Sequence, residues 1–538
     1  MGQFVIENFA NGLDRRKSAD TAPPGSLRVL RNAFLNEGGE IEKRKAFVRN
    51  EALTEYGQTP GFKGRITGPH QVPGSESSVF YRHRADTLPA APWAAGAGSE
   101  AVFLDLNNGD NPPMRAWAMR SATAMANFGI LFHAGSASEF GDFSHLLESY
   151  WPTNESGWMS QHIEVEFDEG EPVAQDVITA NANRAALLTL LNKGYVCAGP
   201  TFFASTVADP GDMAGTGSGA VDTRTQSVPI GSLIALAEYY GALAVFGTRG
   251  VQFWAVDPDF AQNQYQRTIK VSLLAPRSVT GYADGDVLFL SNAGVRSLQA
   301  RDSSNLARVS DVGSPIDSMI RAELDYGESP PEAILGHGYE TRIAKFHSLA
   351  RGAIHEQSGQ FWLCLKDKIY VLSNYPSAKV LAWSVYDLPQ ADADFENVAV
   401  GLLKGRWVAD IAPIRDDLIF RNFADETFIY GGADGARYDQ SQIEVITPHM
   451  DMGRPDSEKQ LRGIDLACYG EWIVEISLDV NNVEWERIAI IQHSSYHSSG
   501  IIPCDLRTTH LAIRLLCTSD YAAKLGQITV LYDGDDER

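Results

Sequence analysis

The sequence has few basic residues for its size and lacks the segments that mark secreted or membrane proteins. Its 538 residues include 45 Lys and Arg against 68 Asp and Glu, which gives a formal net charge of -23 at pH 7. A protein that grips nucleic acid electrostatically usually carries the opposite sign. No apolar stretch approaches the roughly 18 residues that span a bilayer, and the first residues lack the pattern of a signal peptide. The sequence therefore predicts no membrane insertion by this chain.

Cysteine is scarce, and the spacing of the cysteines shows no paired motif. The five cysteines are odd in number, lie far apart and contain no Cys-x-x-Cys pair; they are Cys197, Cys364, Cys468, Cys504 and Cys517. All but Cys504 fall in apolar, strand-like runs, where a buried thiol is the default. We therefore expect folding in a reducing cytoplasm.

The common motifs of enzyme chemistry are also missing. The sequence has no Gly-x-x-x-x-Gly-Lys-Ser/Thr phosphate loop and no Gly-x-Ser-x-Gly nucleophile elbow. The glycine cluster at 215–220 lacks the flanking strand and helix of a dinucleotide site, which favours a flexible loop. His493 and His497 have a spacing that suits zinc on a helix, but the Ser-rich segment around them favours a surface loop.

No residues can be nominated for catalysis, for a cofactor or for a metal. Residues 105–111 resemble a calcium loop, yet the glycine comes one position early and Ala116 stands where an EF-hand requires glutamate. Weak calcium binding by that loop stays open. With 68 carboxylates, the choice of a glycosidase-like pair would be arbitrary. The sequence thus predicts a protein that is not an enzyme.

Short apolar runs separated by turn residues dominate the chain. One such unit has strands at 232–240, 242–246 and 251–256, with turns at Gly241 and at Thr248-Arg249-Gly250. The same pattern recurs from 277, from 352 to 389 and from 398 to 438, where Asp434-Gly435 is a strong turn signal. Helical signals are few, since 184–192 and 122–132 suit a strand as well as a short helix.

Each unit is a small antiparallel meander that cannot bury both of its faces alone, so successive meanders must stack. Radial stacking into a β-propeller leaves only short sheet edges, and we favour it over two long packed sheets. The predicted fold is mainly β. It comprises an N-terminal arm and closing strand at 1–60, a β-propeller-like domain with an inserted loop-rich region at 61–445, and a C-terminal β-sandwich-like domain at 446–538. Residues 64–170 are open between divergent blades and a separate insertion.

Several loose motifs are spread across most of the chain. At the N-terminus a Pro-Gly step leads into a strand that ends in Asn, and a Gly-Glu turn leads into a basic pair. Further motifs follow, and the segments concerned are 9–13, 22–32, 38–44, 202–210, 234–254, 285–295, 310–316 and 447–462. Together these segments resemble the tail nozzle, or hub, proteins of short-tailed bacteriophages, a family that includes packaged-DNA stabilisation and tail tubular proteins.

The resemblance implies a structural virion protein of the tail that is assembled in the host cytoplasm. Nozzle subunits form a ring, expected to be a homohexamer, that extends the DNA channel below the portal and adaptor. The implied partners are copies of the chain itself, adaptor or head-to-tail connector proteins, and tail fibre or tailspike proteins. Double-stranded DNA would touch the lumen transiently and without specificity, and the ring would retain the packaged genome until ejection. The alternatives are a phage-borne propeller enzyme or glycan-binding protein that acts on host polysaccharide, and a cytoplasmic scaffold that binds peptides.

Two further sets of residues carry expectations. The basic clusters Arg15-Arg16-Lys17 and Lys43-Arg44-Lys45 are expected to be solvated at a rim, with pairing to acidic patches of neighbouring subunits as the alternative. The tryptophans at strand positions are expected to pack in the core; they are Trp254, Trp362, Trp383 and Trp407.

Overall fold

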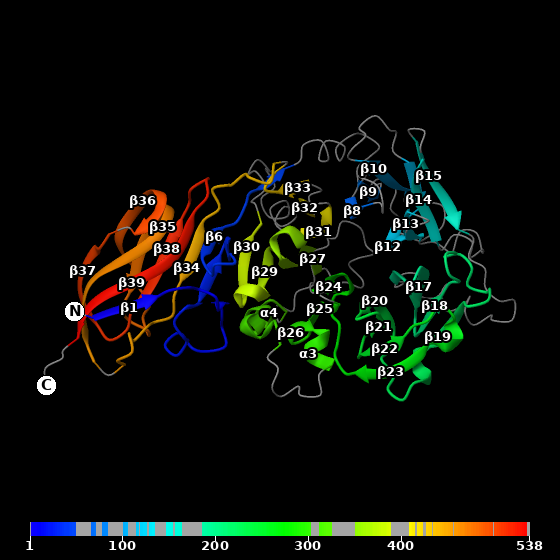
Figure 1. Cartoon of the computed structure of the whole chain (residues 1–538), viewed down its shortest axis with the longest axis horizontal. Coiled ribbons are helices and arrows are strands. Elements are labelled where there is room, and N and C mark those ends of the chain that lie inside the picture. Colours follow the sequence, from blue (N-terminus) through cyan, green and yellow to red (C-terminus); the bar gives the residue numbers. More distant parts are fainter. Residues whose placement is uncertain are drawn as a thin grey trace.

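The molecule consists of two β-bodies side by side along its long axis, a ring of small sheets and a β-sandwich (Figure 1). This computed structural model describes residues 2–49, 66–71, 78–83, 100–105, 114–117, 119–125, 129–134, 147–153, 157–163, 186–302 without 284, 311–324, 350–388, 408–414, 417–422 and 427–534 without 433, 456 and 499. Both chain ends lie at the sandwich end of the molecule. The predicted mainly β fold is confirmed.

The ring is built from sheets of three or four antiparallel strands. The first two blades are β8 (Ile66–Gln71), β9 (Ser78–His83), β10 (Glu100–Asp105) and β11 (Met114–Trp117), then β12 (Met119–Met125), β13 (Gly129–Ala134), β14 (Leu147–Thr153) and β15 (Gly157–Ile163). The next two are β16 (Ala186–Leu190), β17 (Lys193–Ala198), β18 (Thr201–Ala204) and β19 (Gly219–Asp222), then β20 (Leu233–Tyr239), β21 (Ala242–Gly247), β22 (Val251–Ala255) and β23 (Gln264–Ile269). Residues 64–170, which the sequence left open, therefore contribute two blades.

The remaining blades lie nearer the sandwich. They are β24 (Thr280–Tyr282), β25 (Asp286–Ser291) and β26 (Gly294–Ser297), then β27 (Arg351–His355), β28 (Gln360–Leu365), β29 (Lys368–Tyr375) and β30 (Val380–Asp387), and finally β31 (Val408–Ile414), β32 (Asp417–Asn422) and β33 (Thr427–Tyr430). After β26 the chain forms the short helices α3 (Leu298–Asp302) and α4 (Asp317–Leu324), which pack on that blade. Neither helix was predicted.

The blades close into a propeller. The first strand of each blade packs against the first strand of the next, and β31 packs against β8, so that the circuit of seven blades is complete. The fourth strand of the last blade is β7 (Phe47–Arg49), which pairs antiparallel with β33. The N-terminal segment thus supplies the strand that completes the last blade, a short strand shielding an edge that would otherwise be open.

Apolar side chains on both faces of a blade explain how the blades stack. All six residues of β25 (Asp-Val-Leu-Phe-Leu-Ser) are buried, because both faces of the strand contact a neighbour. Phe246 and Phe289 meet edge to face at 5.4 Å between adjacent blades. Trp254 and Trp362 are buried as predicted, whereas Trp407 lies outside the described residues.

The sandwich combines strands from both ends of the chain. Its C-terminal strands are β34 (Ile443–Ile446), β35 (Lys459–Ser477), β36 (Glu486–Ser498), β37 (Ile502–Thr508), β38 (Ala512–Cys517) and β39 (Lys524–Gly534). Its N-terminal strands are β1 (Gly2–Ile6), β4 (Val29–Arg31), β5 (Ala33–Leu35) and β6 (Ile41–Lys43), beside the parallel pair β2 (Gly12–Leu13) and β3 (Ser26–Leu27). The sandwich therefore combines residues 2–43 with residues 443–534. The predicted domain boundaries at 60 and 445 treated these two segments as separate parts of the chain.

One strand serves both sheets of the sandwich. The first half of β35 pairs with β37 and β39, and its second half pairs with β36 and β38. The change occurs near Gly470, whose φ of +104° disfavours any residue with a Cβ. A Cβ at this position would lie 2.9 Å from Cβ of Ala523, so glycine is required for the bend.

Candidate assembly surfaces

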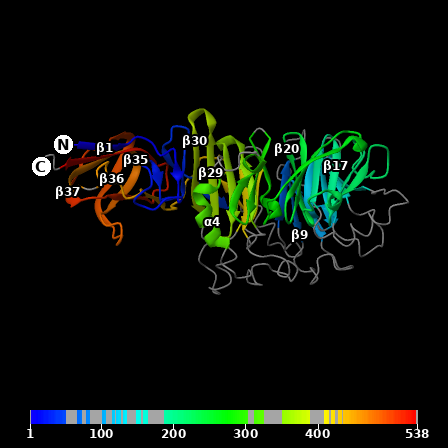
Figure 2. The same cartoon turned by 90° about the horizontal axis from the view of Figure 1, so that it is seen from below.

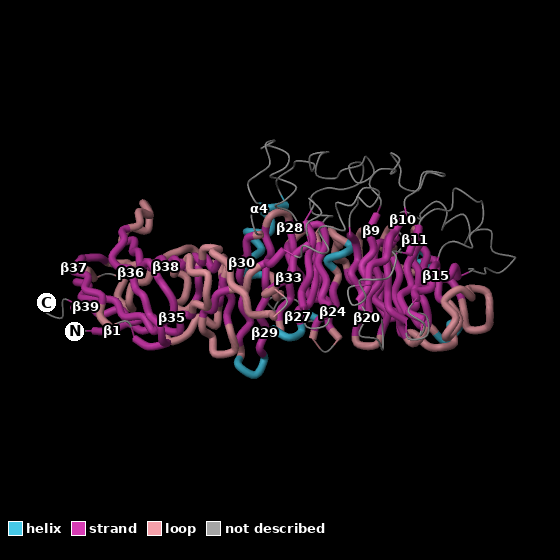
Figure 3. Tube along the Cα trace, turned by 90° about the horizontal axis from the view of Figure 1, so that it is seen from above, coloured by secondary structure: helices cyan, strands magenta, loops and turns pink. Residues whose placement is uncertain are grey.

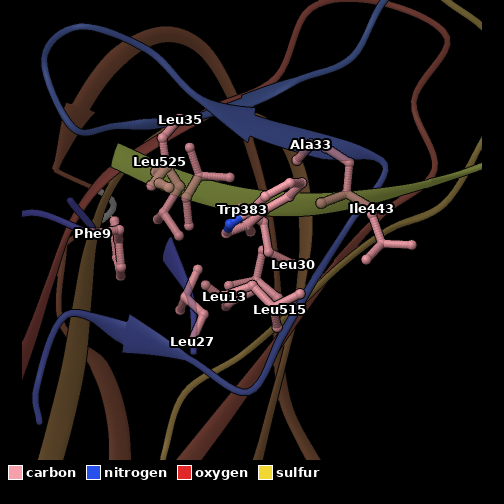
Figure 4. Close-up of a cluster of buried hydrophobic side chains, with 14 of the residues drawn as sticks. Phe9, Leu13, Leu27, Leu30, Ala33, Leu35, Trp383, Ile443, Leu515 and Leu525 are labelled. Atoms are coloured by element: carbon pink, nitrogen blue, oxygen red, sulfur yellow. The ribbon is translucent and has the colours of Figure 1, made fainter. Parts of the chain in front are cut away.

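The candidate sites of this protein are exposed surfaces and the contact between the propeller and the sandwich, which we call the joint. β4 pairs parallel with β30 of the propeller and antiparallel with β34 of the sandwich, so that one hydrogen-bonded sheet runs from blade to sandwich. Trp383 of β30 points among side chains from the N-terminal strands and from β34, β38 and β39 (Figure 4). It is 1% exposed, and its Nε1 donates a hydrogen bond of 2.7 Å to the carbonyl oxygen of Val312. The two bodies thus share one hydrophobic core.

A polar cluster at the same joint is organised by Asn32. This side chain is 2% exposed and takes the left-handed backbone conformation at φ +55°. Its Nδ2 donates to Oδ2 of Asp387 (2.7 Å) and to the carbonyl oxygen of Gln442 (2.9 Å). Its Oδ1 accepts from Nε of Arg44 (3.1 Å) and from the backbone N–H of Asp387 (2.9 Å). Every donor and acceptor of the amide is satisfied, and its partners come from three separate parts of the chain.

The basic cluster at 43–45 belongs to this joint, so the expectation of a solvated rim is wrong for it. Lys43 and Arg44 are 0% and 1% exposed. Nζ of Lys43 donates to the carbonyl oxygen of Ser441 (2.7 Å), and Arg44 forms an ion pair of 2.9 Å with Asp439. Burial lowers the pKa of Lys43. Burial alone would raise the pKa of Asp439, but Arg44 and hydrogen bonds from Ser441 outweigh it and lower that pKa.

The other basic cluster contacts the propeller only in part. Arg16 is exposed and forms an ion pair of 2.7 Å with Asp14, which agrees with the expected solvated position of this side chain. Arg15 is half-buried, burial lowers its pKa, and its backbone N–H donates to the carbonyl oxygen of Pro315 at the start of the α4 region. The buried basic residues escaped the sequence interpretation because charge runs usually mark solvated faces; the adjacent strand pattern at 41–43 was the signal that could have revealed them.

The sandwich presents open sheet edges at its far end. Strands β37, β35, β39 and β1 lie in that order and form a four-stranded arrangement that we call the end sheet (Figure 3). Within the described part of the chain, β1 pairs only with β39 and β37 only with β35. β36 continues the same edge of β35 as β37 does, and it too pairs only with β35 there. Unpaired N–H and C=O groups along such strands can pair with another chain.

Apolar side chains gather along these edges. Phe4 of β1 and Leu506 of β37 pack against the core but remain partly exposed. Ile490 of β36 is 56% exposed, and Ile501, just before β37, is 63% exposed. Exposed apolar side chains beside an unpaired edge are typical of a surface that another strand covers.

Two bulky apolar side chains are exposed on turns of the propeller. Leu191 and Tyr240 occupy the turns after the first strands of two adjacent blades, and they are 45% and 51% exposed. Both are held in the left-handed conformation, with φ of +51° and +47°. Bulky residues at positive φ are uncommon, and such positions concentrate at functional surfaces.

The remaining candidates from the sequence do not converge. His493 and His497 lie in strand β36, opposite Gly470 and Cys468, so the expected surface loop is wrong: pairing with β35 overrode the loop tendency of the Ser-rich segment. Most of the calcium-like loop lies outside the described residues. Among the described residues, no group of three or more His, Cys, Asp or Glu is arranged to hold a metal. All five cysteines are described, all are buried, and none forms a disulfide.

Comparisons with known proteins add little to this picture. No protein-family model and no curated protein matches the chain. Similar solved structures include the Pan2 WD40 domain of Neurospora crassa (8% identity, TM-score 0.38, 74% of this chain and 97% of that chain). BamB from Moraxella catarrhalis is 10% identical, with a TM-score of 0.32 over 68% of this chain and 83% of that chain. The extracellular domain of BT4673 from B. thetaiotaomicron is 8% identical, with a TM-score of 0.36 over 74% of this chain.

The chain spans only 41% of that BT4673 domain. At such low identities and TM-scores these likenesses carry no argument about function. Among the residues that the structure describes, no helix is both long and apolar enough to cross a bilayer.

Proposed function

We propose that the protein is a structural subunit of the tail nozzle, or hub, of a short-tailed bacteriophage, where copies form a ring that extends the DNA channel. The proposal starts from the sequence resemblance described above. The structural observation that supports it best is the joint around Asn32 and Trp383. A channel subunit must keep its shape under load, and a shared core with a continuous sheet resists bending between its two bodies.

The chemistry of the surface is compatible with a DNA conduit. The chain carries a formal net charge of -23. A lumen lined by carboxylates repels the phosphate backbone, so DNA can be retained by obstruction and still leave without adhesion. In this proposal the ring contacts double-stranded DNA transiently, an adaptor on its head-proximal side, and tail fibre or tailspike proteins at its periphery.

The test is assembly of the purified full chain. Native mass spectrometry and electron microscopy should show a closed ring, with a homohexamer as the expected form. The ring should also be detected in virions by mass spectrometry at a few copies per particle. A protein that stays monomeric at micromolar concentrations and hydrolyses a bacterial polysaccharide would refute the proposal and favour the enzyme alternative.

A DNA assay separates a conduit from a DNA-binding protein. We expect the ring to bind double-stranded DNA weakly and its affinity to fall only modestly as salt rises from 50 to 200 mM, because few phosphates are neutralised. Tight binding with a steep slope, equivalent to six or more phosphate contacts, would contradict an acidic lumen.

A further inference from the structure

The end sheet of the sandwich has two different open edges on opposite sides. β37 forms one edge and β1 the other, with β35 and β39 between them (Figure 3). A second view of the molecule likewise places β1 and β37 on opposite sides of this end (Figure 2). A sheet with two open edges can be extended on both sides, whereas a sheet with one open edge can only form pairs.

The strand directions make the two edges fit each other. β37 runs antiparallel to β35, β35 antiparallel to β39, and β39 antiparallel to β1. Directions therefore alternate across the end sheet from β37 to β1. If a second copy in a similar orientation places its β1 beside β37, the alternation continues without interruption. The new pair would be antiparallel, with the hydrogen-bond geometry already used throughout the sheet.

The side chains at the two edges suit such a contact. Phe4 on β1, and Ile502 and Leu506 on β37, pack on the hydrophobic core yet are only partly buried, and no further strand among the described residues pairs with β1 or β37. β1 contains no charged residue (Gly-Gln-Phe-Val-Ile), so it would not repel the exposed Asp505 and Arg507 of β37. Neither strand contains a lysine, the residue that most often guards an exposed edge.

We propose that β37 of one copy pairs antiparallel with β1 of the next copy, so that the end sheets of successive subunits join into one continuous sheet. This inference rests on the proposed ring and names the surface that builds it. The contact is heterologous, since each copy offers two different edges, and repetition of such a contact gives a ring when the rotation closes. The partner is a second copy because one chain carries both complementary edges.

The test replaces one apolar residue with lysine on each edge. Val5→Lys blocks β1 and Ile502→Lys blocks β37, because a lysine on an edge strand disfavours the addition of another strand. The control is Leu381→Lys, which makes the same kind of change at an apolar residue that is 50% exposed on β30 of the propeller, outside the end sheet. Native mass spectrometry of the full-length chains gives the species present, and circular dichroism confirms that each variant is folded.

Each edge variant should lose the ring and weaken self-association at least about tenfold, while Leu381→Lys keeps the ring. An equimolar mixture of Val5→Lys and Ile502→Lys should form a 1:1 heterodimer and nothing larger, because one open β1 edge then meets one open β37 edge. Only a heterologous contact predicts this result. Rings that persist in both edge variants would overturn the inference and leave the proposed function standing.

A wild-type chain that never forms rings would overturn the proposed function itself. If a lysine variant does not fold, cysteines at the exposed positions Gln3 and Asp505 provide an independent measurement. A short bis-maleimide should link the double variant into a ladder of multimers on a denaturing gel. Because the five native cysteines are buried, they should contribute no background. Absence of a ladder from rings of the double variant would overturn the inference.

Discussion

Replacement of Asn32 by alanine tests how much the joint between the two bodies contributes to the free energy of unfolding. The substitution removes four hydrogen bonds, two of which involve the charged groups of Asp387 and Arg44. Net contributions are about 0.5–1.5 kcal/mol for a neutral bond and about 1.5–3 kcal/mol for a bond to a charged group. Alanine at φ +55° adds about 1–2 kcal/mol of backbone strain.

The full sum of these contributions is not expected to be lost, because the groups around residue 32 can find other hydrogen-bond partners after the substitution. The Asp387 side chain is 27% exposed and can recover water, and Arg44 keeps its partners Lys45 and Asp439. We therefore expect Asn32→Ala to lower the free energy of unfolding by about 4 kcal/mol, a large share of the total for a typical protein. Urea unfolding followed by tryptophan fluorescence, at one fixed protein concentration, measures the change.

Two controls isolate the causes. Asn32→Gly removes the same hydrogen bonds without the strain of a left-handed alanine, so it should be more stable than Asn32→Ala by about 1 kcal/mol. Asn482→Ala changes an exposed asparagine in a turn and should alter stability by less than about 0.5 kcal/mol. A loss below about 1 kcal/mol for Asn32→Ala would refute the view that this amide joins the two bodies.

Three further predictions concern other buried positions. Burial, and then the nearby His510, lowers the pKa of His449, so on acidification the unfolded chain binds a proton at this residue more readily than the folded chain does. The melting temperature should therefore fall as the pH is lowered from about 7 to about 5, and His449→Phe should flatten that part of the profile. Gly12→Ala should lower stability by about 2–3 kcal/mol in urea titrations, because its Cβ would lie 2.5 Å from Cβ of Ala382 at a φ of +55°. Burial raises the pKa of Cys468 to about 12, so a thiol reagent at pH 8 should label none of the five cysteines until urea unfolds the protein.

Sequence patterns were informative where structure is local. The strands and turns around Gly241 and Thr248 form as predicted, since alternating apolar runs and glycine at positive φ act within a few residues. Within the ambiguous stretches at 184–192 and 122–132 the described residues form the strands β16, β12 and β13, because pairing with neighbours decides between helix and strand for short apolar runs.

Long-range pairing was much harder to anticipate. Nothing near residue 43 shows that Lys43 meets Ser441, or that Asn32 joins Asp387 to Gln442. The helix α3 after β26 was equally hidden, because its formation depends on packing against that blade. The open edges of the end sheet follow from strand order, which periodicity within a single strand does not encode.

The interleaving of the two chain ends has a consequence for biosynthesis. Among the described residues, β1 pairs with β39 and β7 pairs with β33, so these two N-terminal strands gain their partners only after residues 427–534 have been translated. Such distant contacts slow folding. They also act as a check on completeness: a nascent or truncated polypeptide has no ordered β1 edge to offer, and only finished molecules become competent to join their neighbours.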